Sequence, residues 1–127
     1  MDLAKLDTNM KADEGVEMHL LHPVTNEDTG VVLVLRGASS KPIKAALAKF
    51  RKISEDERKS EAEKDKAASE FLSKCIIEMR NVTYGGKKVE SDAEGIRWFV
   101  ERFQWAANQV LDFVNNIENF LPESDSE

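Results

Sequence analysis

Apolar and polar residues alternate between positions 15 and 21, and this two-residue period is the first clear pattern along the chain. The apolar positions of one face are Val16, Met18 and Leu20. A polar segment rich in turn-forming residues follows at 22–30, and the apolar run at 31–35 consists of valine and leucine. A strand with one buried face requires such an alternation, and valine favours strands. The pattern therefore predicts a β-hairpin over residues 15–36.

A helical period of three to four residues begins after Ser40. Serine is a favoured N-cap, and Pro42 is tolerated in the first turn of a helix. The apolar positions that repeat at this period are Ile43, Ala46, Leu47, Phe50, Ala67, Ala68, Phe71, Leu72, Cys75 and Ile76. A charged stretch at 54–66 interrupts them. We expect helical structure over residues 40–79, either as one long helix with a solvated charged middle or as a helical hairpin with a charged turn.

A glycine pair and a capping signal mark the next two elements. Gly85-Gly86 lies between short β-favouring runs, and glycine accepts positive φ in tight turns, so residues 80–90 are expected to form a turn or a small hairpin. Ser91 and Glu94 have the spacing of a capping box, in which each side chain satisfies an amide at the start of a helix. Helices are therefore predicted over residues 91–121.

The two tryptophans of this last region lie off its apolar face. The residues that form one stripe, if the helix is continuous, are Ile96, Phe99, Val100, Phe103, Ala107, Val110, Val114, Ile117 and Leu121. At about 100° per residue, Trp98 and Trp105 point roughly away from this stripe. One interpretation is that they are exposed and bind a partner, because large aromatic side chains are enriched at interfaces. The other is that the helix is buried on both sides, or breaks near Gln104 and turns Trp105 inward.

These elements together predict an α+β fold that is mostly helical, with an N-terminal β-hairpin packed on several α-helices. A hairpin alone is marginally stable in water, so helices must cover its apolar face. The chain of 127 residues is long enough for one domain, which we place at residues 15–121. Residues 1–14 show no sustained period and are expected to be a flexible tail or a marginal helical turn. Residues 122–127 are expected to be a disordered acidic tail.

Charge and composition narrow the classes of partner. The formal net charge is −6 and the sequence pI about 5.0, so the mean field repels phosphate backbones and we expect no nucleic-acid partner. No apolar run approaches the roughly 20 residues that cross a bilayer, and the first residues do not resemble a signal peptide, so we expect no membrane association or export. The single cysteine, Cys75, cannot form an internal disulfide, which agrees with a reducing cytoplasm.

The candidate chemical sites are weak. His19 and His22 are three residues apart and would face opposite sides of a strand, so they are not expected to share a metal ion. Cys75 lies in an apolar helical stripe without a neighbouring base, which argues against a nucleophile. The Gly85-Gly86 pair and the two lysines after it lack the glycine spacing of a phosphate-binding loop. We therefore expect no catalytic residues, no metal and no cofactor.

Three short motifs follow one another along the chain in a specific order. The first combines a His-Pro turn, a strand and a Gly-x-x-Ser element, at Leu20-Leu21-His22-Pro23-Val24-Thr25-Asn26, Gly30, Val31 to Leu35 and Gly37-Ala38-Ser39-Ser40. The second, at Ile76 to Val89, is an apolar and polar run with a glycine pair and then lysine. The third consists of Trp105, Gln109-Val110, Phe113 and Asn119-Phe120-Leu121. In this order the motifs resemble the tail assembly chaperone family of long-tailed phages, although Ala38 and the charged stretch at 54–66 depart from the family pattern.

The resemblance implies a non-enzymatic function in tail morphogenesis. Family members bind and solubilise the long tape measure protein before the tail tube polymerises around it, and a longer form, made by translational frameshifting, recruits tail tube subunits. This chain would be the short form, with the tape measure protein as its partner, self-association, a location in the host cytoplasm, and absence from the mature virion. The residues that we expect to contact partners are Trp98, Trp105, Phe113, Phe120 and Leu121. The alternatives are a structural tail-completion or connector component of the virion, and an adaptor without a role in phages.

Overall fold

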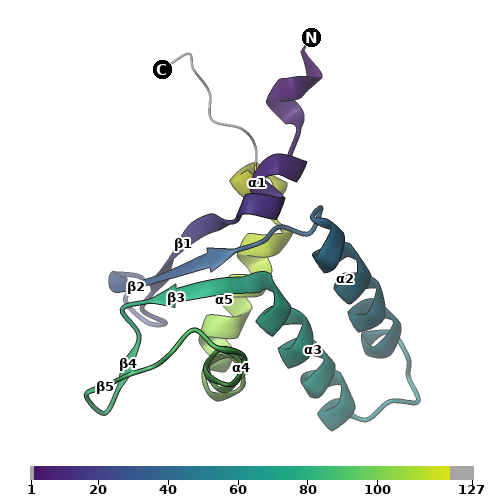
Figure 1. Ribbon diagram of the computed structural model, residues 1–127. Coiled ribbons are helices and arrows are strands. Elements are labelled where there is room, and N and C mark those ends of the chain that lie inside the picture. The colour runs from purple at the N-terminus through teal and green to yellow at the C-terminus, as the bar shows by residue number, and fades with distance from the viewer. Residues whose placement is uncertain (1, 121–127) are drawn as a thin grey trace.

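The computed structural model describes residues 2–120, and the predicted acidic tail at 122–127 lies outside this range. The helices are α1 (Asn9–Glu14), α2 (Lys41–Ser54), α3 (Glu61–Cys75), α4 (Ala93–Arg102) and α5 (Gln104–Asn115). The strands are β1 (Val16–Leu21), β2 (Asp28–Leu35), β3 (Ile76–Arg80), β4 (Thr83–Tyr84) and β5 (Lys87–Lys88). Two 3-10 turns, η1 (Leu3–Leu6) and η2 (Ile117–Phe120), lie near the ends. The predicted class, a mostly helical α+β fold with an N-terminal hairpin, is confirmed (Figure 1).

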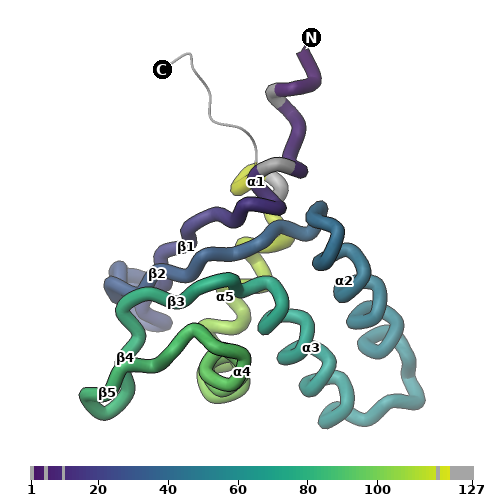
Figure 2. Tube along the Cα trace, viewed as in Figure 1, coloured from purple at the N-terminus to yellow at the C-terminus, as the bar shows by residue number. Residues whose placement is uncertain are grey.

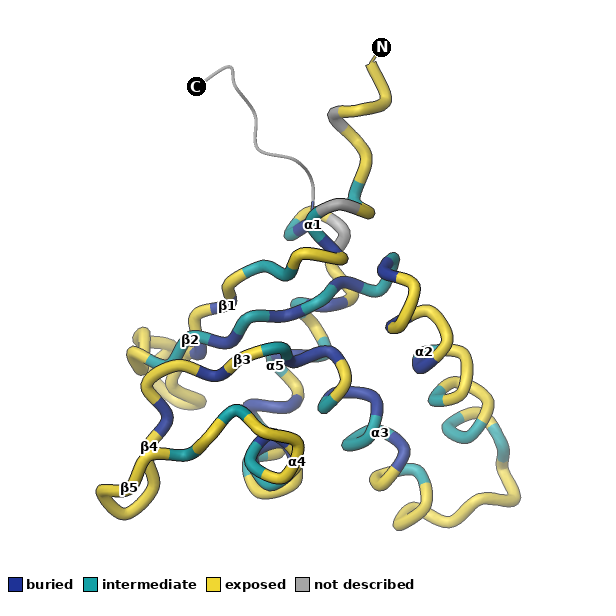
Figure 3. Tube along the Cα trace, in the orientation of Figure 1, coloured by how far each residue is buried: buried dark blue, intermediate teal, exposed yellow. Residues whose placement is uncertain are grey.

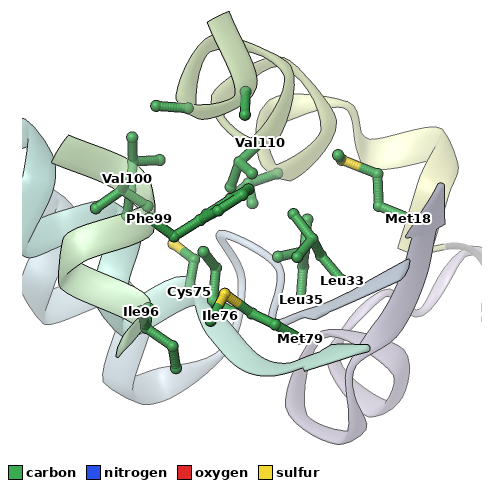
Figure 4. Packing of buried hydrophobic residues seen from close by; sticks show 14 of the residues in the cluster. Met18, Leu33, Leu35, Cys75, Ile76, Met79, Ile96, Phe99, Val100 and Val110 are labelled. Atoms are coloured by element: carbon green, nitrogen blue, oxygen red, sulfur yellow. The ribbon is translucent and has the colours of Figure 1, made fainter. Parts of the chain in front are cut away.

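The three longer strands form an antiparallel sheet in the order β1-β2-β3. Leu33 on the central strand lies opposite Met18 on one side and Met79 on the other, and all three side chains are buried. Figure 4 shows Phe99 of α4 and Val110 of α5 facing this apolar side of the sheet. The helices thus remove the hairpin's apolar face from water, as the two-residue period requires.

The α2–α3 region is a helical hairpin, the second of the two arrangements considered for this segment. Residues 55–60 form the turn, in which the Arg58 side chain and amide bind the Asp56 carboxylate and hold its pKa below the usual value. Ser60 caps α3 by accepting a hydrogen bond from the Glu63 amide at 3.2 Å. The rings of Phe50 and Phe71 stack with centroids 5.2 Å apart. This stacked pair joins the two helices.

The prediction of helix over residues 40–79 is wrong at its C-terminal end. Helix α3 ends at Cys75, and Ile76–Arg80 forms β3, which pairs with β2. The Cys75 carbonyl accepts a hydrogen bond from the Arg36 amide at 2.8 Å. The second edge of β2 would otherwise carry unpaired backbone groups, so pairing within the sheet outweighs the local helical period.

The start of α2 is confirmed at Lys41, with Ser40 in the N-cap position. The Ser40 side chain, however, makes no cap hydrogen bond, and its buried hydroxyl has no partner among the described residues. Only its backbone follows the expectation, because the Ser40 amide donates to the Gly37 carbonyl at 3.1 Å and its carbonyl accepts from the Lys44 amide. The N-terminus of α2 therefore lacks the side-chain cap that the sequence suggested.

The glycine pair forms the predicted tight turn. Thr83 pairs with Lys88 and Tyr84 with Lys87, so β4 and β5 make a small second hairpin. Gly85 and Gly86 have φ values of +59° and +83°. Positive φ at both central residues is the requirement of a type I′ turn, and glycine meets it without steric strain.

The last helical region consists of two helices, and the first of them has a different N-cap from the predicted one. Phe103 interrupts the helix, because its φ of −115° and ψ of 81° lie outside the helical region. The capping-box prediction at Ser91 is wrong, because Asp92 is the N-cap and its carboxylate accepts from the Gly95 amide at 2.7 Å. Ser91 instead uses its hydroxyl to bind both backbone groups of Met79, at 2.8 and 2.9 Å. The serine joins the loop to the edge strand β3, so it is not free to cap the helix.

Part of the predicted N-terminal tail is ordered as α1, which lies beside η2 (Figure 2). Ala12 is buried, and its carbonyl accepts a hydrogen bond from the Gly37 amide at 3.2 Å. A Cβ added to Gly37 would lie 3.0 Å from Ala12 Cβ and 2.9 Å from the Phe120 ring, so this glycine allows close packing. A six-residue helix is too short to be stable alone, and docking stabilises it in a way that no period of the sequence signals.

Candidate protein-binding site

A shallow hollow of about 390 Å³ lies between the first hairpin and α5, and we refer to it as the β1–α5 hollow. Its lining residues are Met18, His19, Leu21, Asn26, Gln109, Asp112, Phe113, Asn116 and Asn119. Five of these belong to the first or the third family-like motif, namely Leu21, Asn26, Gln109, Phe113 and Asn119. The hollow therefore brings together residues that the sequence separates by about 80 positions or more.

Gln109 fixes the end of strand β1. Its Nε2 donates to the Leu21 carbonyl at 2.8 Å, and its Oε1 accepts from the Leu21 amide at 3.0 Å. Leu21 ends an edge strand, where backbone groups lack a strand partner on one side. The side-chain amide thus takes the place of a neighbouring peptide group and holds α5 against the hairpin.

His22 organises the turn that borders the hollow. Its Nδ1 accepts hydrogen bonds from the amides of Val24 and Thr25 at 3.1 and 3.2 Å. The His22 carbonyl accepts from the Asn26 amide at 3.0 Å, and Asn26 has a positive φ of 62°. The His-Pro motif is therefore a turn-forming element, in which the imidazole replaces the backbone acceptors that the turn lacks.

The C-terminal part of the third motif closes the other end of the hollow. The Asn119 side chain donates to the Phe113 carbonyl at 2.9 Å and so caps the last turn of α5. The rings of Phe113 and Phe120 meet edge to face with centroids 5.8 Å apart. Phe113 is half-buried and lines the hollow, whereas Phe120 is only 2% exposed and leaves little surface for a partner. Leu121 lies outside the described residues.

The two tryptophans belong to an aromatic cluster at the other end of α5. The members of the aromatic cluster are Tyr84, Trp98, Phe103 and Trp105. The ring centroids of Tyr84 and Trp98 are 5.2 Å apart, those of Trp98 and Phe103 5.6 Å, and those of Phe103 and Trp105 6.2 Å. Both tryptophans are half-buried and pack against the core, so the inward-turning interpretation, with a break next to Gln104, describes the geometry.

Tyr84 and Phe103 are the members that the sequence interpretation missed. Tyr84 is 50% exposed, and Arg102 lies against it with its guanidinium carbon 5.8 Å from the ring centroid and Nη2 3.2 Å from the hydroxyl. The sequence feature that could have identified Tyr84 is its position directly before the Gly85-Gly86 turn. In the fold, this hairpin lies beside α4, where the Tyr84 ring contacts Trp98. For Phe103 the helical period placed the ring in a continuous stripe, and the break removes it from that stripe.

The polar groups near the hollow are engaged in structural contacts. His19 Nδ1 lies 3.1 Å from the Asp28 carboxylate, while the His22 ring faces its own turn. Across the residues that the structure describes, no group of three or more His, Cys, Asp or Glu side chains is placed to hold a metal ion. Burial raises the pKa of the Cys75 thiol to about 12, so this fully buried side chain remains a protonated thiol near neutral pH.

A larger groove of about 600 Å³ lies between α3 and the α4–α5 pair. Its side chains carry charges of both signs, from Asp65, Lys66, Glu70, Arg97 and Glu101. None of these residues is buried, so the groove presents ordinary surface charge. The β1–α5 hollow, with the Phe113 ring and several amide groups, has more of the features of a binding site.

The three motifs are neighbours in the fold. Leu21 of the first motif binds Gln109 of the third, and Leu33 of the first pairs with Met79 of the second. Tyr84 of the second motif and Trp105 of the third both contact Phe103. Comparison with protein-family models, curated proteins and solved structures finds no match for the chain. No helix among residues 2–120 has the length and apolar character needed to cross a membrane.

Proposed function

We propose that the chain is a tail assembly chaperone of a long-tailed phage, which binds and solubilises the tape measure protein. The observation that carries the proposal is the convergence of the first and third family-like motifs on the β1–α5 hollow, where Gln109 binds Leu21. A family-like pattern of surface residues gains support when its parts form one continuous surface. The hollow supplies polar and apolar contacts for a polypeptide.

The chemistry of the hollow fits a polypeptide ligand. Gln109 and Asn119 use their side-chain amides within the fold, for Leu21 and Phe113, whereas Asn26 and Asn116 present exposed side-chain amides at the hollow. Amides donate and accept hydrogen bonds, so they can pair with the peptide groups of another chain. Phe113 adds a half-buried aromatic surface to the same hollow. A mixture of a ring and uncharged amides suits an extended or helical segment of an aggregation-prone protein.

In this proposal the longer, frameshifted form of the chain recruits tail tube subunits while the domain described here holds the tape measure protein. Many copies would act on one tape measure chain, so the contact of each copy can be weak while the whole assembly is stable. The net charge of −6 keeps such an assembly soluble. The protein would act in the host cytoplasm and leave before the virion is complete.

Co-expression with the tape measure protein encoded beside it tests the proposal. Asp112 is exposed at the edge of the hollow, so Asp112→Arg should reduce co-purification and soluble yield of the tape measure protein. Glu101→Arg, at an exposed position of α4 outside the hollow, makes the same charge change and should have little effect. Equal loss with both variants, or with neither, would contradict the assignment of the hollow.

Protein analysis of purified virions separates the proposal from its main alternative. A chaperone should be absent from mature particles, whereas a tail-completion or connector protein is retained in stoichiometric amounts. Gene order adds an independent check, because the gene should lie between the tail tube gene and a very long tape measure gene. The codons for residues 119–121 are the place to look for a frameshift signal.

A further inference from the structure

The charge of the chain is distributed in blocks. Residues 29–54 contain six basic and no acidic residues, although the whole chain has 18 basic and 24 acidic residues. The remainder of the chain thus has 12 basic and 24 acidic residues, a net charge of −12. The mean charge, which argued against nucleic-acid partners, therefore conceals one strongly basic segment.

Five of these six cations lie on one side of α2. We call the set the basic face, and its members are Lys41, Lys44, Lys49, Arg51 and Lys52. At about 100° per residue they fall within an arc of about 160°, and at 1.5 Å per residue they extend over about 17 Å of the helix. All five are exposed, and Figure 3 shows exposed residues along the outer side of α2. The opposite side, with Ile43 and Phe50, packs toward α3.

The cations of the basic face have no carboxylate partner among the described residues. Three cations elsewhere have such partners, since Arg58 binds Asp56, Lys59 binds Glu63, and Arg80 binds Glu17 and Glu78. Lys41 and Lys44 are three residues apart, as are Lys49 and Lys52, so each pair brings like charges together on the helix surface. The basic face therefore carries repulsion that an external anion would relieve.

The N-terminus of α2 also differs from those of α3 and α4. Its first turn contains Lys41 and Lys44, no acidic residue and no side-chain cap. By contrast, α3 begins with the Ser60 cap and two glutamates, and α4 with the Asp92 cap and Glu94. Cations at the positive end of a helix dipole are unfavourable. Exposed cations in the first turn of α2 do not stabilise the helix, so we look for their role in binding a partner.

We propose that the basic face of α2 docks an acidic polypeptide segment, such as a glutamate-rich helix of a partner protein. The face is about three turns long, which matches a short acidic helix with carboxylates at helical spacing. Acidic residues follow it directly, at Glu55, Asp56 and Glu57 in the turn after α2. A long polyanion such as nucleic acid would extend past the end of α2 onto these carboxylates, whereas a short acidic segment stays within the basic face. The inference does not depend on the proposed function.

Fluorescence anisotropy with a labelled 12-residue polyglutamate peptide and the full chain tests the proposal. We expect binding in 50 mM NaCl that weakens at least about tenfold in 500 mM NaCl, because exposed charges are screened. The triple variant Lys44→Gln, Lys49→Gln, Arg51→Gln should weaken binding by about tenfold, since each exposed ion pair contributes a modest amount. Glutamine preserves helix propensity, and circular dichroism checks the fold.

The matched control is Lys66→Gln, Lys87→Gln, Lys88→Gln, which removes three exposed positive charges outside α2 and should change the affinity by less than about twofold. An equal loss in the control would overturn the proposal, because binding would then follow net charge alone. No binding by the unmodified chain would also overturn it. Tighter binding of a 20-nucleotide DNA, lost in the α2 variant, would assign the face to nucleic acid instead. Salt-sensitive self-association that the α2 variant abolishes would assign it to a second copy.

Discussion

The side-chain amide of Gln109 binds both backbone groups of Leu21, although 88 positions separate the two residues in the chain. The contact joins the C-terminal helix α5 to the edge strand of the N-terminal hairpin. It also lies in the wall of the β1–α5 hollow, because Leu21 and Gln109 both line it. The same glutamine therefore serves the stability of the fold and the shape of the candidate site.

Replacement of Gln109 by leucine should destabilise the protein by about 1–2 kcal/mol, because both hydrogen bonds are lost and the peptide groups of Leu21 lose their partner. Urea unfolding followed by circular dichroism measures the change. Gln104→Leu is the control, since Gln104 is exposed and binds only the Asn108 side chain on its own helix. The control should stay within about 0.5 kcal/mol of the unmodified protein. Equal effects of the two variants would show that the Leu21 contact is not important for stability.

The Cys75 thiol should make the stability fall at alkaline pH. Its pKa is raised from 9.0 to about 12 in the folded protein, because burial disfavours the thiolate. The unfolded chain loses this proton more easily, so the contribution to stability is complete below pH 9 and decreases as the pH rises toward 12. At pH 10 the loss amounts to about 1.4 kcal/mol.

Comparison with Cys75→Ala isolates this effect, because lysine and tyrosine titrations are common to both proteins. The difference in unfolding free energy between the two proteins should shrink by about 1.4 kcal/mol from pH 8 to pH 10. A constant difference over this range would mean that the thiol is accessible to water in the folded state. A thiol reagent offers a second measurement, since Cys75 should react only after unfolding.

The two residues at the start of α4 should both matter, for different reasons. Asp92→Ala removes the N-cap and should cost about 1 kcal/mol, while Asp92→Asn should retain most of the stability. Ser91→Ala should cost a similar amount, because it leaves both backbone groups of Met79 without their partner. Hydrogen exchange distinguishes the two variants. Only Ser91→Ala should speed exchange of the Met79 amide selectively, and equal protection in both variants would contradict this assignment.

The aromatic cluster should separate stability from partner binding. Trp98→Ala with Trp105→Ala should destabilise the chain by about 3 kcal/mol or more, because both rings are half-buried against the core. Tyr84→Ala removes a ring that is 50% exposed and should preserve the fold, so reduced co-purification of the tape measure protein with this variant would assign the cluster to the partner surface. Thermal unfolding and co-expression are the two measurements. Unchanged co-purification in a folded double tryptophan variant would exclude the cluster as a partner surface.

Periodicity predicted the elements that bury an apolar face of their own. The alternation around Met18 and Leu20 identified the first hairpin, and the glycine pair at Gly85-Gly86 identified the second. These signals are local, because a strand or a turn is specified by residues that are close in sequence. The fold class followed from them.

The errors occurred where a distant contact decides the conformation. Ile76 continues a helical stripe in sequence, yet the open edge of β2 draws it into a strand. Ser91 has capping-box spacing, yet its hydroxyl forms hydrogen bonds with the backbone of Met79. The same holds for the candidate site, since no residue near Leu21 in sequence predicts that Gln109 will bind its backbone groups. Single-sequence patterns do not contain the partner of a long-range contact.

The position of β3 has a consequence for synthesis on the ribosome. Strand β2 pairs with β1 as soon as the first hairpin has emerged, but its other edge waits for Ile76, about 40 residues later. At ~5–20 residues per second this interval lasts roughly 2–8 seconds. During that time the nascent chain exposes an apolar valine and leucine strand with unpaired backbone groups. A protein proposed to protect another chain from aggregation thus passes through a brief period in which it is itself open to strand addition.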